Sequence, residues 1–188
     1  MLKYYVKHFY YTRFLILIII IISFFSIIPL AEAAERKTYL VTAVHDGDTV
    51  SIKAKSFIGI PLKIERIRLI CIDAHELKQE PWGRRAKRHL KKLISESNWV
   101  VNVEFDVEQR DKYGRLLCYL WDKNGRLINE RMLEDGYAVL YTLPPNVKYA
   151  ERFTAAQKKA QSKNAGIWGK GGIKKSPEEW RKEHLKNK

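Results

Sequence analysis

The stretch ERIRLICIDAHEL, from Glu65 to Leu77, decides the fold and raises the question of function. Its last residues are apolar on both faces, which is typical of a strand covered on both sides. The same stretch carries Arg68 within the apolar run and ends in two carboxylates, Asp73 and Glu76. A strand that only builds a core needs neither feature, so this segment predicts a site as well as a core.

Other segments around this strand have the alternation or the β-branched composition of strands, separated by turn signals. We expect strands over residues 38–44, 49–54, 62–72, 99–107 and 116–121. The first two are joined by the turn signal DGD (Asp46–Asp48). Five short strands in an open sheet would leave exposed edges, which a closed barrel removes. The sequence therefore predicts an α+β protein built on a small five-stranded barrel.

Helical patterns lie between and after these strands. After Pro81, which suits the first position of a helix, apolar residues recur at helical spacing: Ala86, Leu90, Leu93 and Ile94. The opposite face of this helix is basic: Arg84, Arg85, Lys87, Arg88, Lys91 and Lys92. A second helix is expected over 127–136, ending at Gly136, followed by a short extended piece over 137–141. Asn146 is expected to cap a third helix, which ends near Gly166. The motif SPEE (176–179) resembles a capping box and predicts one or two helical turns in the tail.

The N-terminal segment has the form of a secretory signal peptide. A basic start precedes an apolar run from Phe14 to Leu30, and the small residues Ala31 and Ala33 follow at the two positions that an export peptidase reads. An uncleaved membrane anchor is the alternative, because a run of 17 residues, interrupted only by the polar Ser23 and Ser26, lies at the short end of a spanning helix. Either alternative predicts export of the remaining chain, to the medium or the cell envelope.

The charge of the chain indicates a polyanionic partner. The net charge is +14, and removal of residues 1–33 leaves 32 basic and 20 acidic side chains, a net charge of +12. Nucleic acid, anionic lipid and acidic wall polymer all fit such a charge, which cannot choose among them. The two cysteines, Cys71 and Cys118, lie in apolar runs and could pair in an exported protein. We favour unpaired thiols, because a chain of this size needs no covalent staple.

Four acidic residues follow strands: Asp46 and Asp48 in the first hairpin, and Asp73 and Glu76 after the third strand. If the first and third strands share a barrel, their carboxylates can converge, and they would repel one another unless a cation lies among them. Hard oxygen ligands suit calcium or magnesium, whereas the histidines and cysteines lack zinc spacing. Taken singly, each acidic motif is more often an ordinary turn or a solvated loop.

Two arginines complete the pattern. Arg68 emerges from the apolar strand, and DKYGR (Asp111–Arg115) places Arg115 at the start of another strand. Arginines beside a carboxylate-bound metal can neutralise the charge that develops on a phosphodiester in its transition state, and Glu76 can activate water as a general base. A surface ion pair is the plain alternative for each arginine alone.

Five motifs in order resemble the staphylococcal nuclease (thermonuclease) family over about Thr38–Trp168. They are DGDTV (46–50), IRLICIDAHE (67–76), DKYGRLLCYLW (111–121), INERMLEDGYA (128–138) and NAGIW (164–168). The resemblance implies a five-stranded oligonucleotide-binding (OB) type barrel with about three helices. It also implies hydrolysis of DNA and RNA with one calcium ion, leaving 3′-phosphate ends.

The resemblance also assigns roles residue by residue. Asp48 and Asp73 match calcium carboxylates, and Ala74 stands where the backbone carbonyl of the residue after the second aspartate binds the metal. Glu76 matches the general base, and Arg68 and Arg115 match the two arginines that clamp the phosphate. Positions that border the nucleotide are matched by Lys112, Tyr113 and Tyr141.

Two positions and the length of one segment depart from the family pattern. His75 replaces a proline before the glutamate, Leu143 replaces a tyrosine near the nucleotide, and the segment between Glu76 and the first helix is short. These departures affect substrate affinity and the positioning of the base, and they remove neither a metal ligand nor an arginine.

We divide the chain into a signal peptide or anchor (1–33), a nuclease-like OB-fold domain (34–169) and a basic flexible tail (170–188). The residues and the resemblance together predict an exported, calcium-dependent endonuclease, acting as a monomer on DNA, on RNA or on both, that meets the membrane only if its N-terminal segment is uncleaved. A non-catalytic nucleic-acid-binding barrel at the cell surface is the alternative, and a binder of anionic lipid or wall polymer is a second one. Neither alternative needs Glu76.

Overall fold

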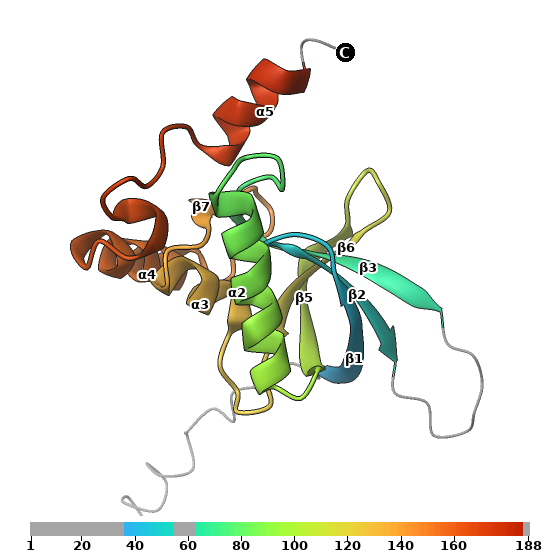
Figure 1. Cartoon of the computed structure of the whole chain (residues 1–188). Coiled ribbons are helices and arrows are strands. Elements are labelled where there is room, and N and C mark those ends of the chain that lie inside the picture. The colour runs from blue at the N-terminus through green and yellow to red at the C-terminus, as the bar shows by residue number, and fades with distance from the viewer. Residues whose placement is uncertain (1–35, 55–62, 186–188) are drawn as a thin grey trace, which may run out of the picture. The chain divides into compact units, whose positions relative to one another are not determined.

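A computed structural model describes residues 36–54 and 63–185 of the chain (Figure 1). The expected signal peptide or anchor, residues 1–33, lies outside the described residues and stays a prediction. Among the helices that the structure describes, none is both long enough and apolar enough to cross a membrane.

Five strands form a closed barrel in the order β1-β2-β3-β6-β5. Their bounds are Lys37–Val44 (β1), Thr49–Ala54 (β2), Ile64–Leu69 (β3), Val100–Arg110 (β5) and Leu116–Trp121 (β6). Neighbouring strands are antiparallel except β3 and β6, which run parallel. The parallel register sets Arg68 opposite Leu117, so the start of β6 lies beside the end of β3. The predicted α+β fold with a five-stranded barrel is confirmed.

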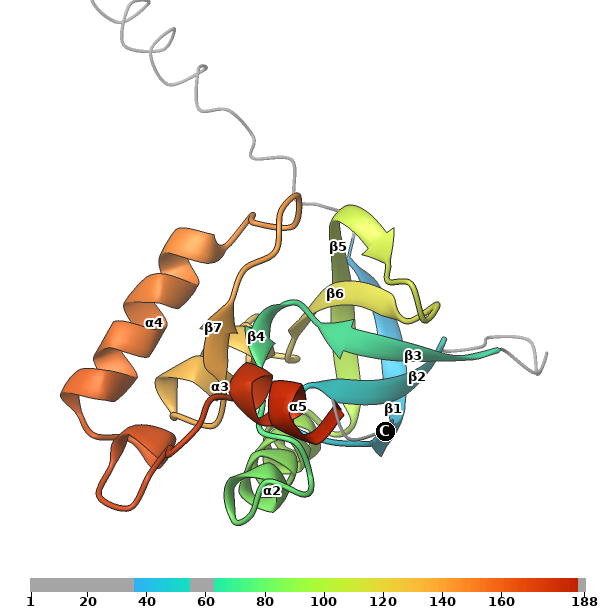
Figure 2. The ribbon, with the colours of Figure 1, turned by 90° about the horizontal axis from the view of Figure 1, so that it is seen from above.

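The expected single strand over 62–72 is wrong in one respect, because the chain breaks it after Leu69. Cys71–Asp73 forms a separate strand, β4, that pairs with β7 (Val139–Tyr141) in a two-stranded sheet. At the break Cys71 has a φ of 61°, in the left-handed region that side chains other than glycine rarely adopt. Figure 2 shows the β4–β7 pair between the barrel and α4. The bend carries Asp73 away from β3, toward the loop that precedes the first helix.

Helix α2 (Trp82–Glu96) begins directly after Pro81 and buries the expected apolar stripe, from Ala86 to Ile94. It also supports the hairpin that contains Asp48. A Cβ atom on Gly47 would lie 2.5 Å from the Cβ of Ala74 and 2.7 Å from that of Ala86. Only glycine fits this contact without a shift of the neighbouring backbone, which explains the middle residue of DGD.

The remaining helices are α3 (Ile128–Glu134), α4 (Ala150–Ser162), the 3-10 turn η1 (Gly166–Trp168) and α5 (Pro177–Leu185). Helix α3 is followed by Gly136 with a φ of 70°, as its stop signal predicts. The expected capping role of Asn146 is wrong. Its buried side-chain amide bonds both backbone groups of Glu108, accepting from the N–H and donating to the carbonyl oxygen. The SPEE capping box is confirmed, since Ser176 and Glu179 bond each other reciprocally at the start of α5.

One apolar core joins the barrel interior to the inner faces of α2, α3 and α4. Cys71 and Cys118 belong to it as free, buried thiols, which confirms that they are unpaired. The Cys71 thiol donates to the carbonyl oxygen of Asn146 at 3.1 Å, and burial raises its pKa. Their role is therefore one of packing.

Candidate active site

Two carboxylates and one arginine meet where the first hairpin approaches β4. Arg68 places its Nη1 3.0 Å from Asp48 Oδ2 and its Nη2 3.0 Å from Asp73 Oδ1. Nη1 also donates to the carbonyl oxygens of Leu69 and Ile72, so the guanidinium is fixed on the bend between β3 and β4. The predicted convergence of Asp48 and Asp73 at Arg68 is present in the structure.

Asp48 is short of positive charge. Its side chain is buried, and Oδ2 accepts the Ala74 N–H at 2.8 Å. Burial raises the pKa of Asp48 to about 7, although the Arg68 guanidinium opposes the rise. Burial without enough compensating charge favours the protonated form of a carboxyl group. A further cation at this point would let Asp48 ionise fully at neutral pH.

Glu76 reaches the same site through an arginine that the sequence did not single out. Arg181, on α5, places Nη1 3.0 Å from Glu76 Oε1 and 3.1 Å from Asp73 Oδ1, and Nη2 2.6 Å from Asp73 Oδ2. Asp73 is only 1% exposed, whereas the Glu76 side chain is 39% exposed. Glu76 therefore stands at the solvent side of the cluster, where a water molecule can reach it.

Asp46 and His75, the neighbours in sequence of Asp48 and Asp73, form a turn and pack in the core, respectively. Asp46 accepts the backbone N–H of Asp48 at 3.0 Å and so forms the turn. His75, at the position of the family proline, is buried, and neither ring nitrogen has a hydrogen-bond partner among the described residues. Burial lowers the pKa of His75 to about 4, so it is neutral at pH 7 and acts as a packing group.

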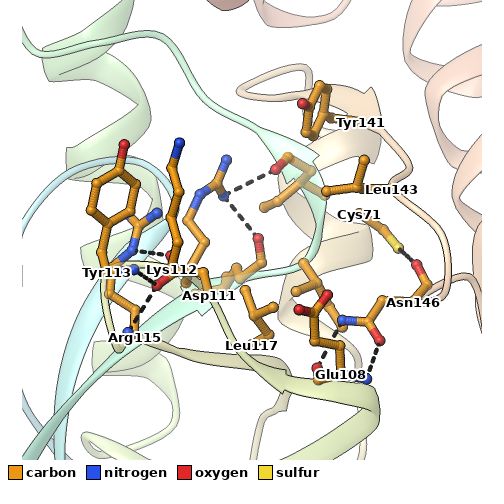
Figure 3. Close-up of a pocket in the computed structure, with 14 residues that line it drawn as sticks. Cys71, Glu108, Asp111, Lys112, Tyr113, Arg115, Leu117, Tyr141, Leu143 and Asn146 are labelled. Atoms are coloured by element: carbon orange, nitrogen blue, oxygen red, sulfur yellow. Dashed lines mark hydrogen bonds and ion pairs between the residues drawn. The ribbon is translucent and has the colours of Figure 1, made fainter.

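A pocket of about 490 Å³, within the size range of small-ligand sites, opens at Arg68, and its lining does not include Asp48, Asp73 or Glu76. Its lining includes Arg68 and every residue predicted to hold the substrate: Lys112, Tyr113, Arg115 and Tyr141. Lys112, Tyr113 and Arg115 lie on one side of the pocket, and Tyr141 and Leu143 lie on the other (Figure 3). Tyr113 is 73% exposed, so its ring is free to meet a ligand. A basic wall facing aromatic and apolar side chains suits a nucleotide with its phosphate.

Arg115 is oriented by its own turn. Its Nε donates to Asp111 Oδ2 at 2.6 Å, and its backbone N–H donates to Asp111 Oδ1 at 2.9 Å. Arg115 thus shares the pocket with Arg68 but is not bonded to Asp48 or Asp73. The contact leaves Arg115 partly exposed, with 29% of its side chain accessible.

The carboxylate oxygens of the cluster are ligands of the chemical type that a hard cation binds. Across the described ranges 36–54 and 63–185, no group of three or more His, Cys, Asp or Glu side chains is arranged for a metal ion. The cluster instead gathers its oxygens around guanidinium cations, with Arg68 between Asp48 and Asp73 and Arg181 between Asp73 and Glu76. Carboxylate oxygens are the ligands that calcium prefers, so the chemistry of this set of oxygens suits a hard cation.

Fold and site together define a class of protein: an OB-type barrel with a carboxylate and arginine cluster that shares Arg68 with a pocket of basic and aromatic side chains. Comparison with known proteins gives the family. The family described as "Staphylococcal nuclease homologue" matches residues 66–170. The chain is 36% identical to the thermonuclease of Staphylococcus intermedius over 137 residues, covering 70% of this chain and 76% of that protein. It is 34% identical to the thermonuclease of Staphylococcus hyicus, covering 72% and 78%. Identity to "Endonuclease YncB" of Bacillus subtilis (strain 168) is 33%, covering 68% and 59%.

The chain belongs to the staphylococcal nuclease family. Relatives named thermonuclease and endonuclease support a nuclease activity, which makes the protein a hydrolase with a nucleic-acid substrate. The residue that the sequence analysis missed is Arg181. The capping box predicts the helix that carries it, but no pattern indicates that this helix packs on residues more than 100 positions earlier.

Proposed function

We propose that the protein is an exported, calcium-dependent endonuclease that hydrolyses phosphodiester bonds of DNA and RNA and leaves 3′-phosphate ends. The observation that carries the proposal is the position of Arg68. Its guanidinium bonds the carboxylates of Asp48 and Asp73, and its side chain also lines the pocket that contains Arg115 and Tyr113. A phosphate held in this pocket would therefore meet the carboxylate cluster at Arg68.

Each side chain has a defined task in this proposal. Arg68 and Arg115 bind the scissile phosphate and stabilise the charge that grows on its oxygens in the transition state. Lys112, Tyr113 and Tyr141 hold the adjoining nucleotide by charge and by stacking. Because Asp111 fixes the guanidinium of Arg115, less side-chain freedom remains to be lost when the phosphate binds.

Glu76 is the proposed general base. Its carboxylate is partly exposed at the edge of the cluster, where it can take a proton from a water molecule that attacks phosphorus. A purely binding barrel would have no use for a carboxylate there, since it would repel the phosphate.

Asp48, Asp73 and the backbone carbonyl of Ala74 would hold the calcium ion, which neutralises phosphate charge when bound. We infer calcium because carboxylate and carbonyl ligands on loops suit its larger, flexible shell, and we expect magnesium to substitute poorly. We infer export from the apolar run of Phe14–Leu30. A search for the chain in the culture medium and in the cell envelope would test export.

The test is cleavage of plasmid DNA by the full chain in calcium, in magnesium and with a chelator, followed by analysis of the product ends. Calcium-dependent cleavage with 3′-phosphate ends is expected. Binding without cleavage in calcium would favour the non-catalytic barrel. Full activity in magnesium with calcium removed would contradict the calcium assignment, and RNA in the same assay tests the second substrate.

The basic face of α2 gives an independent test of nucleic-acid affinity. Arg84, Arg85, Arg88, Lys91 and Lys92 are exposed there. Log affinity for duplex DNA should fall with log salt by about 0.9 for each phosphate neutralised. Affinity that is nearly constant between low and moderate salt would contradict a polyanionic substrate.

A further inference from the structure

Helix α5 places a cation of its own in the carboxylate cluster. Arg181 makes three hydrogen bonds there, two to the carboxylate of Asp73 and one to Glu76, from 108 and 105 residues further along the chain. A guanidinium that grips one carboxylate through two parallel bonds is among the strongest polar contacts a side chain makes. The contact is therefore specific in geometry, unlike an ordinary surface ion pair.

The surroundings of Arg181 hold it in place. Both views show α5 beside the connection from β4 to α2 (Figures 1 and 2), and Gln79 in that connection donates its Nε2 to the carbonyl oxygen of Lys175 at 2.8 Å. Pro177, at the start of the helix, is buried. The capping box of Ser176 and Glu179 defines the first turn, so Arg181 projects from an ordered helix.

The contact with Arg181 occupies Asp73 and Glu76, the carboxylates that the proposed hydrolysis uses. Both carboxylate oxygens of Asp73 are engaged, Oδ1 by Arg68 and Arg181 and Oδ2 by Arg181 at 2.6 Å. Glu76 is engaged through Oε1. A metal ion at Asp73 would bring a second positive charge against the guanidinium, so the two cations compete for the same oxygens.

We propose that α5 is an autoinhibitory helix whose Arg181 occupies the cation site and must leave it before metal binds. The inference rests on the proposed function, because it takes Asp73 and Glu76 as metal ligand and base. Arg181 acts as a tethered competitor at constant effective concentration, so it lowers the apparent metal affinity at every protein concentration. Displacement of α5 frees Asp73 for the metal and Glu76 for water in a single event.

The test compares calcium binding to the full chain and its variants by titration calorimetry, without nucleic acid. Arg181→Ala should tighten calcium binding by about 10- to 100-fold, the loss expected for charge-assisted hydrogen bonds. Arg181→Lys, which keeps the charge but not the paired bonds, should fall between. Lys182→Ala is the matched control, since it removes a positive charge from the same helix while its partner is Glu178. It should leave calcium affinity nearly unchanged.

A second measurement follows the helix itself. Calcium should speed amide hydrogen exchange in residues 177–185 of the unsubstituted chain, because it displaces Arg181. Asp73→Asn, which loses the charge on the principal partner of Arg181, should speed that exchange without calcium. These results would show that α5 leaves its contact with Asp73 and Glu76 when calcium binds.

The outcomes separate this inference from the proposed function. If calcium binds the unsubstituted chain and not Asp73→Asn, while Arg181→Ala is unchanged or weaker, the inference is overturned and the calcium site stands. The same holds if Arg181→Ala lowers cleavage at saturating calcium without changing affinity, since Arg181 would then contact substrate. If neither the unsubstituted chain nor Arg181→Ala binds calcium, the proposed calcium site fails and the inference fails with it.

Discussion

Two of the buried carboxylate sites in the described structure, at Glu104 and at Asp48 with Asp73, differ in how far their charge is satisfied. Glu104, on β5, is 3% exposed and receives Trp121 Nε1 at 2.8 Å, Tyr149 OH at 2.8 Å and Lys148 Nζ at 2.7 Å. Arg36 Nε adds a contact at 3.1 Å. Burial would raise the pKa of Glu104, but the bonds from Lys148 and Tyr149 and the nearby charges outweigh it and lower that pKa.

Asp48 has the opposite balance, with burial raising its pKa to about 7. Its cluster is completed by Arg181 from a separate helix at the end of the chain, bonded to Asp73 and Glu76. A cluster with its donors in place stabilises the fold, whereas a buried carboxylate short of charge is typical of a functional site. Activity and stability should therefore respond differently to substitutions in the two clusters.

The largest expected effect is on catalysis, in Glu76→Gln. Loss of the general base should slow cleavage by roughly 10²- to 10⁴-fold. The free energy of unfolding should change little, because the Glu76 side chain is partly exposed and bonds only Arg181 in the described structure. Cleavage rate and urea unfolding measured on one preparation check both expectations. A folded variant that cleaves at the unsubstituted rate would remove Glu76 from the mechanism.

Glu104→Gln should show the reverse pattern. It removes the charge that pairs with Lys148 and Arg36, and we expect a loss of about 2–3 kcal/mol of unfolding free energy at pH 7. The pKa of Glu104 is lowered in the fold, so its contribution is present above the unfolded pKa and disappears as pH falls through the folded one. The difference from the unsubstituted chain should therefore shrink below pH 4.5. A constant difference from pH 7 to pH 3 would show that charge is not the cause.

In the absence of metal, Asp48→Asn should raise the free energy of unfolding, whereas Glu104→Gln should lower it. A raised folded pKa means that the fold binds more protons than the unfolded chain, so stability falls as pH rises toward 7. The amide avoids this charge and still offers an oxygen to the Ala74 N–H, so we expect a gain on the order of 1 kcal/mol at pH 8. Chemical unfolding with a chelator present measures it. A clear loss at pH 8 would mean that the Arg68 contact outweighs burial.

The smallest effect is expected for Lys148→Met. Lys148 bonds Glu104, but its side chain is 43% exposed, so water screens the pair. We expect a loss of under about 1 kcal/mol, because partly exposed ion pairs contribute little. Thermal unfolding of Lys148→Met and Glu104→Gln, measured side by side, would check that the lysine variant loses less stability. A larger loss from Lys148→Met than from Glu104→Gln would show that lysine rather than the acid holds the cluster together.

The barrel could be predicted because its strands have alternation and clear turn signals. The break between β3 and β4 could not. Residues 69–72 are all buried, so no change in hydropathy marks the point where the chain turns, and Cys71 is not a residue type that indicates positive φ. The prediction that Asn146 caps a helix was wrong for a related reason. The residue type favours a helix start, but tertiary contact with Glu108 satisfied its amide.

The site was predictable to the extent that its groups lie at strand ends and turns. Arg68, Asp73 and Glu76 share one stretch, and DKYGR is a turn with its own internal pairing of Asp111 and Arg115. What the sequence does not show is which distant segments meet. Arg181 is one basic residue in a basic tail, and only the packing of α5 distinguishes it from its neighbours.

The contact at Gly47 has a consequence for heat resistance. Gly47 leaves no room for a methyl group between the first hairpin, Ala74 after β4, and Ala86 on α2. A calcium ion held by Asp48, Asp73 and the Ala74 carbonyl would sit beside this junction and tie two of its three segments together. A ligand at 100 times its dissociation constant adds about 2.7 kcal/mol to the folded state. In a domain of roughly 150 residues this raises the melting temperature by several degrees. The temperature at which the protein melts would thus depend on the calcium content of its surroundings.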